Sequence, residues 1–260
     1  MSLTLSHGPL SGKPADSNYH IEGPAHRLFF EKFPRRVRAL FGGQPVFDTR
    51  RGKLLHETGI VPQLYVPRED VRFDMLQGTQ RSTHCPLKGD AAYWSVRSRD
   101  RIAENAVWGY PEPREGARWL HDYVAFYWNA MDAWFDEDEE IQGHLRDPYH
   151  RVDVRDTSRH VRVIASGKMV AETARSKVVS ETGLPNRFYI PPEDTRCDLL
   201  EPSATHTICP YKGIASYKTL RVREHPITDA AWFYPEPLED AAKVRGYICF
   251  LAKGVTFEVD

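Results

Sequence analysis

The second half of this chain repeats the first. When the 260-residue sequence is shifted by 124 positions, the segment beginning at His26 falls on the segment beginning at His150, and the register holds without a gap to Asp260. About a third of the aligned positions are identical. An ungapped register of this length predicts two copies of one domain, because such internal repeats reflect duplicated structural units.

The repeat sets the expected domain boundaries. We expect an N-terminal arm over residues 1–25, a first domain over residues 26–147 and a second over residues 148–260. The arm is rich in Gly, Pro and Ser, which predicts a loosely ordered segment. Residues 136–150, which begin with the acidic run at 136–140 and contain a proline, predict a surface connection between the domains. Each domain has about 110 residues, enough for its own hydrophobic core.

Within each copy the pattern indicates strands. VRALFGGQPVF and VRVIASGKMVA predict hairpins that turn at Gly43 and Gly167. Residues 67–76 and 191–200 combine an early proline with acidic residues, which predicts a brief helix. The segment YVAFYWNAMDAWFDED aligns with the strand–turn–strand pattern of YICFLAKGVTFEVD, and this favours strands in both copies. We therefore expect a mainly β fold, with two homologous small β-rich domains and few short helices.

Composition excludes several partners. The formal net charge is −1, so no basic field is available to neutralise the phosphates of a nucleic acid. No apolar run approaches the roughly 20 residues that span a bilayer, and we expect no membrane partner. The first residues lack the basic start and apolar core of a secretory signal. We therefore expect a cytoplasmic protein whose four cysteines are reduced.

A zinc site is not favoured. Structural zinc usually takes four ligands that arrive in pairs such as Cys-x2-Cys, whereas each repeated motif supplies one cysteine. His84, beside Cys85, is replaced by Ile208 in the second copy, and neither Cys197 nor Cys249 is shared. We expect no metal and no cofactor.

The motif Cys-Pro-x-Lys-Gly occurs at residues 85–89 and again at 209–213. Lys88 and Lys212 lie three residues after the cysteines, where a turn could bring the ammonium near the thiol and lower its pKa. Cys85 and Cys209 are therefore candidate nucleophiles. The alternative is a buried cysteine at a turn in which glycine supplies an unusual backbone angle.

Tyr-Pro-Glu-Pro also occurs twice. The flanking prolines hold Glu112 and Glu236 in an extended segment beside aromatic residues. Such a carboxylate suits a polar ligand pocket, or it could pair with Lys88 in a structural ion pair. The glutamates of Glu-Thr-Gly, Glu57 and Glu181, are either turn residues or pocket acids. The candidate catalytic residues are Glu112, Glu236, Lys88, Lys212, Cys85 and Cys209.

Aromatic residues recur at matched positions in the predicted strands. They form either the core of each domain or the wall of a pocket. Arg72 and Arg196 each precede an aspartate by two residues, which predicts an internal Arg–Asp pair or a pocket cation. The candidate ligand-binding residues are Tyr65, Tyr93, Trp108, Tyr110, Arg72, Tyr189, Tyr217, Trp232, Tyr234 and Arg196.

Four motifs carry a family resemblance: E-T-G, Y-x-P-x-E-D-x-R-x-D, C-P-x-K-G-x-A-x-Y and Y-P-E-P. In this order they resemble domain-of-unknown-function family 427, here as a tandem pair similar to two-copy bacterial members. The resemblance implies a small β domain of Mss4-like, β-tent-like topology. Relatives of that architecture often hold zinc on Cys-x-x-Cys pairs, which this chain lacks.

The family is also labelled nucleotidyltransferase-like. Nucleotidyl transfer needs clustered carboxylates for magnesium beside a phosphate-binding loop. This sequence has no Gly-rich phosphate loop, and its acidic run at 136–140 is absent from the second copy. The label remains an alternative.

The leading hypothesis is a protein that binds or transforms a small polar metabolite without metal. In an enzyme, glutamate would act as general acid or base, and Lys or Arg would stabilise negative charge. One alternative is a protein-interaction module that uses the tryptophans of the first copy, and another is a redox role for the Cys-Pro motif. The oligomeric state stays open. The tryptophans are Trp94, Trp119, Trp128 and Trp134.

Overall fold

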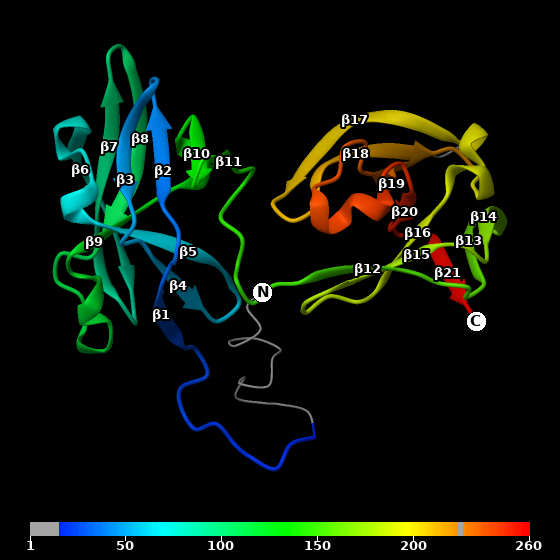
Figure 1. Ribbon diagram of the computed structural model, residues 1–260, viewed down its shortest axis with the longest axis horizontal. Helices are drawn as coiled ribbons and strands as arrows, with labels where there is room; N and C mark the ends of the chain where they lie inside the picture. The colour runs from blue at the N-terminus through cyan, green and yellow to red at the C-terminus, as the bar shows by residue number, and fades with distance from the viewer. Residues whose placement is uncertain (1–15, 223–225) are drawn as a thin grey trace. The chain divides into compact units, whose positions relative to one another are not determined.

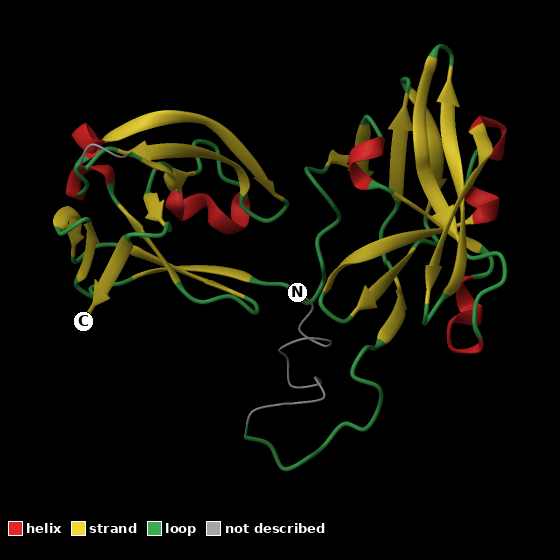
Figure 2. Cartoon of the chain, turned by 180° about the vertical axis from the view of Figure 1, so that it is seen from behind, coloured by secondary structure: helices red, strands yellow, loops and turns green. Residues whose placement is uncertain are grey.

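The computed structural model describes residues 16–222 and 226–260 (Figure 1). The chain forms two compact units, of which the first ends at Asp147 and the second begins at Pro148. Strands make up most of each unit and the helical segments are short (Figure 2). No helix in the described part of the chain is long and apolar enough to cross a membrane. The mainly β fold predicted from the repeat is confirmed.

The described part of the first unit contains a large and a small antiparallel sheet. The large sheet has the order β1-β4-β5-β9-β8-β7-β6, and the small sheet has the order β11-β10-β2-β3. The large sheet is built from β1 (Leu28–Lys32), β4 (Lys53–Glu57), β5 (Ile60–Pro67), β6 (Leu76–Cys85), β7 (Gly89–Ser98), β8 (Arg101–Gly109) and β9 (Tyr123–Phe126). The small sheet is built from β2 (Val37–Phe41), β3 (Gln44–Thr49), β10 (Ala133–Asp136) and β11 (Glu139–Glu140).

The second unit repeats this arrangement. Its large sheet has the order β12-β15-β16-β20-β19-β18-β17, and its small sheet has the order β14-β13-β21. The large sheet is built from β12 (Val152–Asp156), β15 (Lys177–Glu181), β16 (Arg187–Ile190), β17 (Leu200–Cys209), β18 (Gly213–Leu220), β19 (Ile227–Phe233) and β20 (Ile248–Phe250). The small sheet is built from β13 (Val161–Ala165), β14 (Lys168–Thr173) and β21 (Val255–Val259).

These elements include the hairpins and the short helical segments that the sequence predicts. The hairpins expected at Gly43 and Gly167 are β2–β3 and β13–β14. Each predicted brief helix is a pair of 3-10 turns, and the segment from Tyr123 forms β9 and β10 around a further turn. The turns are η2 (Arg68–Asp70), η3 (Phe73–Met75), η4 (Glu115–Leu120), η5 (Trp128–Ala130), η6 (Pro192–Asp194), η7 (Cys197–Leu199) and η8 (Glu239–Val244). The Mss4-like topology stays a prediction.

The expected arm contains no strand in its described part, and the acidic run lies inside the first unit. Residues 16–25 of the expected arm form no strand, and residues 1–15 lie outside the described residues. The acidic run at 136–140 belongs to the small sheet of the first unit, because it ends β10 and forms β11. The run is therefore part of the folded unit, and the connection falls after it, at Asp147 and Pro148.

The large sheet of the first unit buries both of its faces. Side chains alternate along a strand, so Leu64 and Val66 of β5 enter the core shared with the small sheet, while Tyr65 enters a second cluster on the opposite face. We call this second group the aromatic cluster. Its main buried members are Leu55, Tyr65, Ala91, Tyr93, Tyr110, Ala117, Leu120 and Ala125, with Phe30, Cys85, Trp108 and Trp119 packed against them.

The second unit has the same two-faced sheet. Phe188 and Ile190 of β16 enter the main core, whereas Tyr189 enters the opposite cluster. In both units a 3-10 turn covers this cluster: Ala117 and Leu120 of η4 in the first, and η8 in the second. The aromatic cluster of the second unit contains Val154, Val179, Tyr189, Ala215, Tyr234, Ala241, Val244 and Cys249, with Tyr217, Trp232 and Tyr247 packed against them.

The glycine of Cys-Pro-x-Lys-Gly is required by backbone packing. Gly89 and Gly213 have φ of +102° and +100°, a region that favours glycine. A Cβ at Gly89 would lie 3.1 Å from the carbonyl oxygen of Glu112, and one at Gly213 would lie 3.1 Å from that of Glu236. The Tyr-Pro-Glu-Pro segment therefore packs its backbone directly on the Lys-Gly turn, which explains why the two motifs recur together.

Substituting this glycine should destabilise the first unit more than substituting a turn glycine in open space. Gly43 has φ of +74°, and a Cβ at this position would meet nothing within 4 Å, so Gly43→Ala should lose about 1 kcal/mol from backbone strain alone. We expect Gly89→Ala to lose about 3 kcal/mol, because it adds the clash with the Glu112 carbonyl. Urea unfolding followed by fluorescence measures both, and equal losses would contradict this packing.

Candidate functional site

The repeated geometry of the site begins at the Lys-Gly turn. Lys88 lies between β6 and β7, and its side chain is only 10% exposed. Its Nζ is 2.5 Å from Oε2 of Glu57, the last residue of β4. The second carboxylate oxygen of Glu57 is also used, because His26 Nε2 lies 2.9 Å from Oε1. We call these three residues the Lys–Glu–His triad.

The second unit builds the same triad from the matched residues. Lys212 Nζ donates to Oε2 of Glu181, and His150 Nε2 lies 3.0 Å from Oε1. Both units therefore use the same carboxylate oxygen for lysine and the same one for histidine. Lys212 and Glu181 are buried to nearly the same extent as their counterparts. The arrangement is a repeated property of the fold.

The triad joins distant parts of the large sheet. In the strand order, β4 lies next to one edge, whereas the β6–β7 turn belongs to the other edge. Glu57 and Lys88 can meet only because the sheet curls over the aromatic cluster. The curl brings three segments together that lie 31 residues apart in the sequence: His26, Glu57 and Lys88.

The two triads differ in how far the histidine is covered. His26 has 42% of its side chain exposed, whereas His150 has 7%. The difference arises from Tyr211, whose ring centroid lies 4.3 Å from that of His150. The matched residue in the first unit is Leu87, which has no aromatic ring to stack on His26.

Electrostatics keep Glu181 ionised. Burial alone would raise the pKa of its carboxyl, but the hydrogen bond from His150 and the charge and hydrogen bond of Lys212 outweigh burial and lower the pKa to about 2. The carboxylate therefore stays charged over the physiological pH range and holds Lys212 and His150 in place.

The aromatic cluster forms the wall beside the triad. Tyr65, Tyr93 and Tyr110 are buried and Trp108 is half-buried. Lys88 Nζ lies 5.8 Å from the ring centroid of Tyr110. The second unit keeps the arrangement with Tyr189, Tyr217, Trp232 and Tyr234, where Trp232 Nε1 donates to Tyr189 Oη at 3.1 Å.

Burial raises the pKa of four phenols in these clusters, so they stay protonated and can donate a hydrogen bond. In the first unit, the charges of Cys85 and Glu57 raise the pKa of Tyr110 further. The four are Tyr65, Tyr110, Tyr189 and Tyr234. The predicted aromatic residues therefore serve as core, and Tyr110 lies beside the lysine of the first triad.

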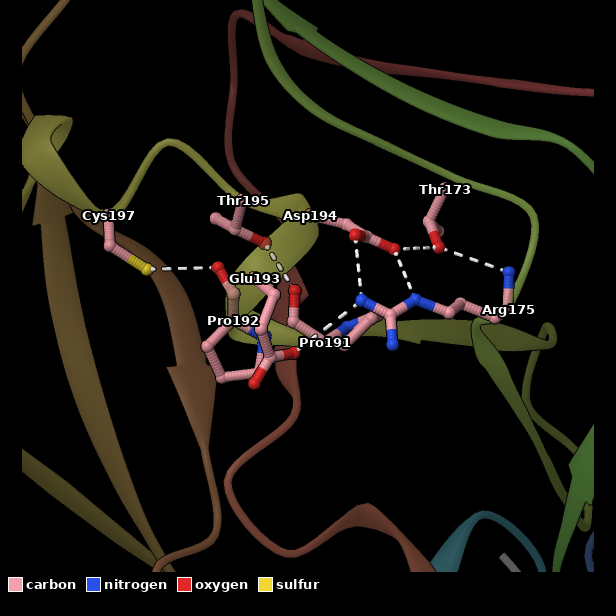
Figure 3. Close-up of polar contacts among 8 residues, drawn as sticks. All are labelled: Thr173, Arg175, Pro191, Pro192, Glu193, Asp194, Thr195 and Cys197. Carbon is pink, nitrogen blue, oxygen red and sulfur yellow. Dashed lines mark hydrogen bonds and ion pairs between the residues drawn. The ribbon is translucent and has the colours of Figure 1, made fainter.

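The motif cysteines lie at the edge of this wall. Cys85 ends β6 and Cys209 ends β17, and both thiols are free and partly buried. The other two cysteines have unrelated surroundings. Cys249 is fully buried, which raises the pKa of its thiol to about 12, and Cys197 is exposed beside the Pro192 carbonyl (Figure 3).

Glu112 and Glu236 do not reach the lysines in this structure. Both side chains are exposed, and Glu236 forms an ion pair with Arg245 at 3.1 Å. The Tyr-Pro-Glu-Pro segments act instead through the backbone, since Arg114 N–H donates to the Lys88 carbonyl at 3.1 Å. The carboxylate that meets each lysine comes from Glu-Thr-Gly.

Arg72 and Arg196 form the Arg–Asp pairs that were one of the two predicted alternatives, and both pairs lie at the surface. Each guanidinium makes two hydrogen bonds to the aspartate two residues on, with Arg72 Nη2 2.6 Å from Asp74 and Arg196 Nη2 2.7 Å from Asp198. These exposed pairs flank the turns η3 and η7. Phe73 of η3 packs against the main core, on the other face of the sheet from the aromatic cluster.

A second repeated cluster explains the acids of the Y-x-P-x-E-D motif. Arg175 makes two hydrogen bonds to Asp194, and Thr173 Oγ1 donates to the same carboxylate at 2.6 Å (Figure 3). The Arg175 N–H in turn donates to Thr173 Oγ1 at 3.0 Å. This cluster ties the β14–β15 connection to η6. The first unit repeats it with Thr49, Arg51 and Asp70.

The acidic residues at positions 136 and 138 form ion pairs with arginines. Asp136 pairs with Arg35 at 2.7 Å and Asp138 pairs with Arg38 at 3.1 Å. Across residues 16–222 and 226–260, no three His, Cys, Asp or Glu side chains come close enough together to hold a metal.

The tryptophans of the first unit pack within that unit. Trp134 is buried and its ring centroid lies 4.4 Å from that of Trp128. Trp119 stacks on Phe30 at 4.6 Å, and Trp94 meets the edge of a neighbouring phenylalanine. These indoles contribute to the two cores, and a docking role for them stays a prediction.

The family comparison agrees with the repeat. Residues 29–137 and 153–260 each match the family model described as a domain of unknown function (DUF427). The two matches cover most of the chain, which therefore belongs to this family as a tandem pair of copies. A search of curated proteins found no match.

Removing the carboxylate of the triad should cost stability at neutral pH. Glu181→Gln leaves Lys212 buried without a counter-charge, and we expect a loss of about 3 kcal/mol in the free energy of unfolding. Because the pKa of Glu181 falls from 4.5 to about 2 on folding, the wild-type advantage is complete above about pH 5 and is lost as the pH falls toward 2. Urea unfolding of both proteins across this range measures the difference.

Glu236→Gln is the matched control, since its carboxylate is exposed and pairs only with Arg245 at the surface. Its stability should equal that of the wild type at every pH. A Glu181→Gln protein that is as stable as the wild type at pH 7 would contradict the role of this carboxylate.

Proposed function

We propose that each unit binds a small polar metabolite at its Lys–Glu–His triad, against the aromatic cluster. One observation carries the proposal: the same three residue types, joined through the same atoms around a buried Lys–Glu pair, occur in both units. The proposal does not require a metal.

Energetics support a role beyond stability. Transferring a lysine and a glutamate out of water costs free energy that their attraction barely offsets, and a pair of apolar residues in their place is often as stable. The fold nevertheless keeps the pair in two copies that have otherwise diverged widely. Fixed charges of this kind are typical of binding and catalytic sites.

The site presents donors, which indicates the chemistry of the ligand. An ammonium has three N–H donors, and Glu57 takes one of those of Lys88. The phenol of Tyr110 is protonated and lies close to that ammonium. The ammonium charge is balanced by the glutamate. We infer a ligand that offers oxygen acceptors, such as a carbonyl or carboxylate group.

The same groups would serve a reaction. Lysine and the phenols can stabilise negative charge that develops on a ligand oxygen. The histidine can exchange a proton while the glutamate orients its ring, a role that the sequence pattern had assigned to Glu112 and Glu236. Cys85 and Cys209, at the edge of the wall, stay candidate nucleophiles.

The first unit is the better candidate for binding, because Tyr211 covers the histidine of the second triad and no aromatic ring of a described residue covers His26 in this way. We therefore expect the two copies to bind the same ligand with unequal affinity. The interaction-module and nucleotidyltransferase-like alternatives have no comparable repeated arrangement among the described residues to support them.

Replacing both lysines should weaken ligand binding. We expect native mass spectrometry of the gently purified full chain to detect a co-purified ligand. Alternatively, saturation-transfer NMR should detect binding of added pyruvate, succinate or 4-hydroxybenzoate to the full chain. Lys88→Met with Lys212→Met should weaken binding at least about tenfold, because the ligand oxygen loses its charged donor.

Glu112→Gln with Glu236→Gln is the control, and it should bind like the wild type because both carboxylates are exposed. Loss of binding in this control, with binding retained in the lysine variant, would move the site to the Tyr-Pro-Glu-Pro segments. If no probe and no co-purified ligand binds the wild type, the proposal is wrong.

A further inference from the structure

The second unit contains a cavity of about 400 Å³ that is separate from its triad. The cavity lies where the chain leaves β12 and where β15 begins, with one aromatic ring beside it. The residues that matter for its chemistry are Asp156, Thr157, Ser158, Ser176, Lys177 and Tyr247. Hydroxyl groups dominate this set.

Comparison of the two units shows that two of these hydroxyls stand where the first unit has residues without a hydroxyl. At the positions of Thr157 and Ser176, the first unit has Phe33 and Gly52. Phe33 is 2% exposed and belongs to the main core. A Cβ at Gly52 would lie 3.0 Å from Leu64 Cδ1, so a side chain at this position would press on Leu64 in the first unit. The second unit has thus exchanged a buried ring for two hydroxyls.

One of these hydroxyls is buried without a partner. Ser176 is 1% exposed, and its Oγ makes no hydrogen bond to any described residue. An unpaired buried hydroxyl destabilises the fold, and such a group is commonly satisfied by a bound water or ion. Thr157 and Ser158 add two more hydroxyls to the cavity. The wall therefore suits a ligand that can both accept and donate hydrogen bonds.

The charges around the cavity are balanced. Lys177 Nζ donates to Asp156, whose other oxygen lies 3.5 Å from Lys243 Nζ. The guanidinium of Arg175 is held by Asp194 (Figure 3) and lies 3.8 Å from a second carboxylate, that of Glu193. Because every one of these cations faces a carboxylate, the cavity has no surplus positive charge to hold a phosphate or sulfate.

We infer that this cavity binds a neutral polyhydroxylated ligand the size of a monosaccharide. Sugar hydroxyls donate and accept, so they can pair with Ser176 and with the Asp156–Lys177 ion pair. The ring of Tyr247, 5.4 Å from Lys177 Nζ, offers an apolar wall for the C–H face of a sugar. The volume lies at the low end of small-molecule pockets, about 300–1,000 Å³. The inference does not rest on the triad.

The test fills the cavity by giving the second unit the side chains that the first unit has at two matched positions. Thr157→Phe combined with Phe188→Leu places at these positions the residues of the first unit, Phe33 and Leu64, which both belong to its main core. Saturation-transfer NMR on the full chain, with D-glucose and D-ribose as probes, should show binding of at least one sugar to the wild type. The double variant should bind it at least about tenfold more weakly, and Glu112→Gln with Glu236→Gln, which changes exposed carboxylates outside the cavity lining, should bind it unchanged.

Two further variants keep the test decisive. Ser176→Gly, which removes the hydroxyl and leaves the cavity open, should also weaken binding of the sugar. Thr157→Leu replaces the double variant if circular dichroism shows that the latter is unfolded. The inference is overturned if neither sugar binds the wild type, or if filling the cavity leaves sugar binding unchanged. Binding of inorganic phosphate alone, detected by ³¹P NMR, would overturn the neutral ligand class.

Discussion

The ion pair between Lys88 and Glu57 joins two parts of one sheet that its strand order keeps far apart. The rest of each unit is consistent with this single constraint. The large sheet has to curl so that the β6–β7 turn reaches the end of β4, and the concave face this creates has to be filled. The aromatic cluster fills it, and a 3-10 turn closes it from outside. A buried charge pair is tolerated here because both oxygens of the glutamate are satisfied.

Comparing the two units separates what the fold requires from what has been free to change. The triad, the left-handed glycine of the Lys-Gly turn and the Thr–Arg–Asp cluster are built identically in both. Differences gather around them: Tyr211 covers one histidine, and Thr157 stands where the first unit buries a phenylalanine. The two units share these three features as a common frame, and they differ mainly in the side chains packed beside that frame.

Sequence patterns located the site motifs but could not pair them. The repeat singled out Lys88 because it recurs beside a glycine, yet the partner it meets, Glu57, was left between a turn role and a pocket role. Glu112 was predicted as a catalytic residue because prolines on both sides hold it beside aromatic residues. In the structure those prolines serve the backbone, which packs on the Lys-Gly turn, and the carboxylate points to solvent. His26 was visible as a shared histidine, but nothing local indicated its distance from Glu57.

The sequence by itself determined that two homologous β-rich units follow one another, where their hairpins turn and which residues the units share. These features are local or repeated, because strand alternation, turn glycines and prolines act over a few residues. Only the tertiary structure decided which carboxylate holds each lysine, that one sheet buries both faces, and that a cavity replaces a ring in the second unit. These depend on the curl of a seven-stranded sheet and on packing between segments tens of residues apart, and neither is encoded in the pattern of any single segment.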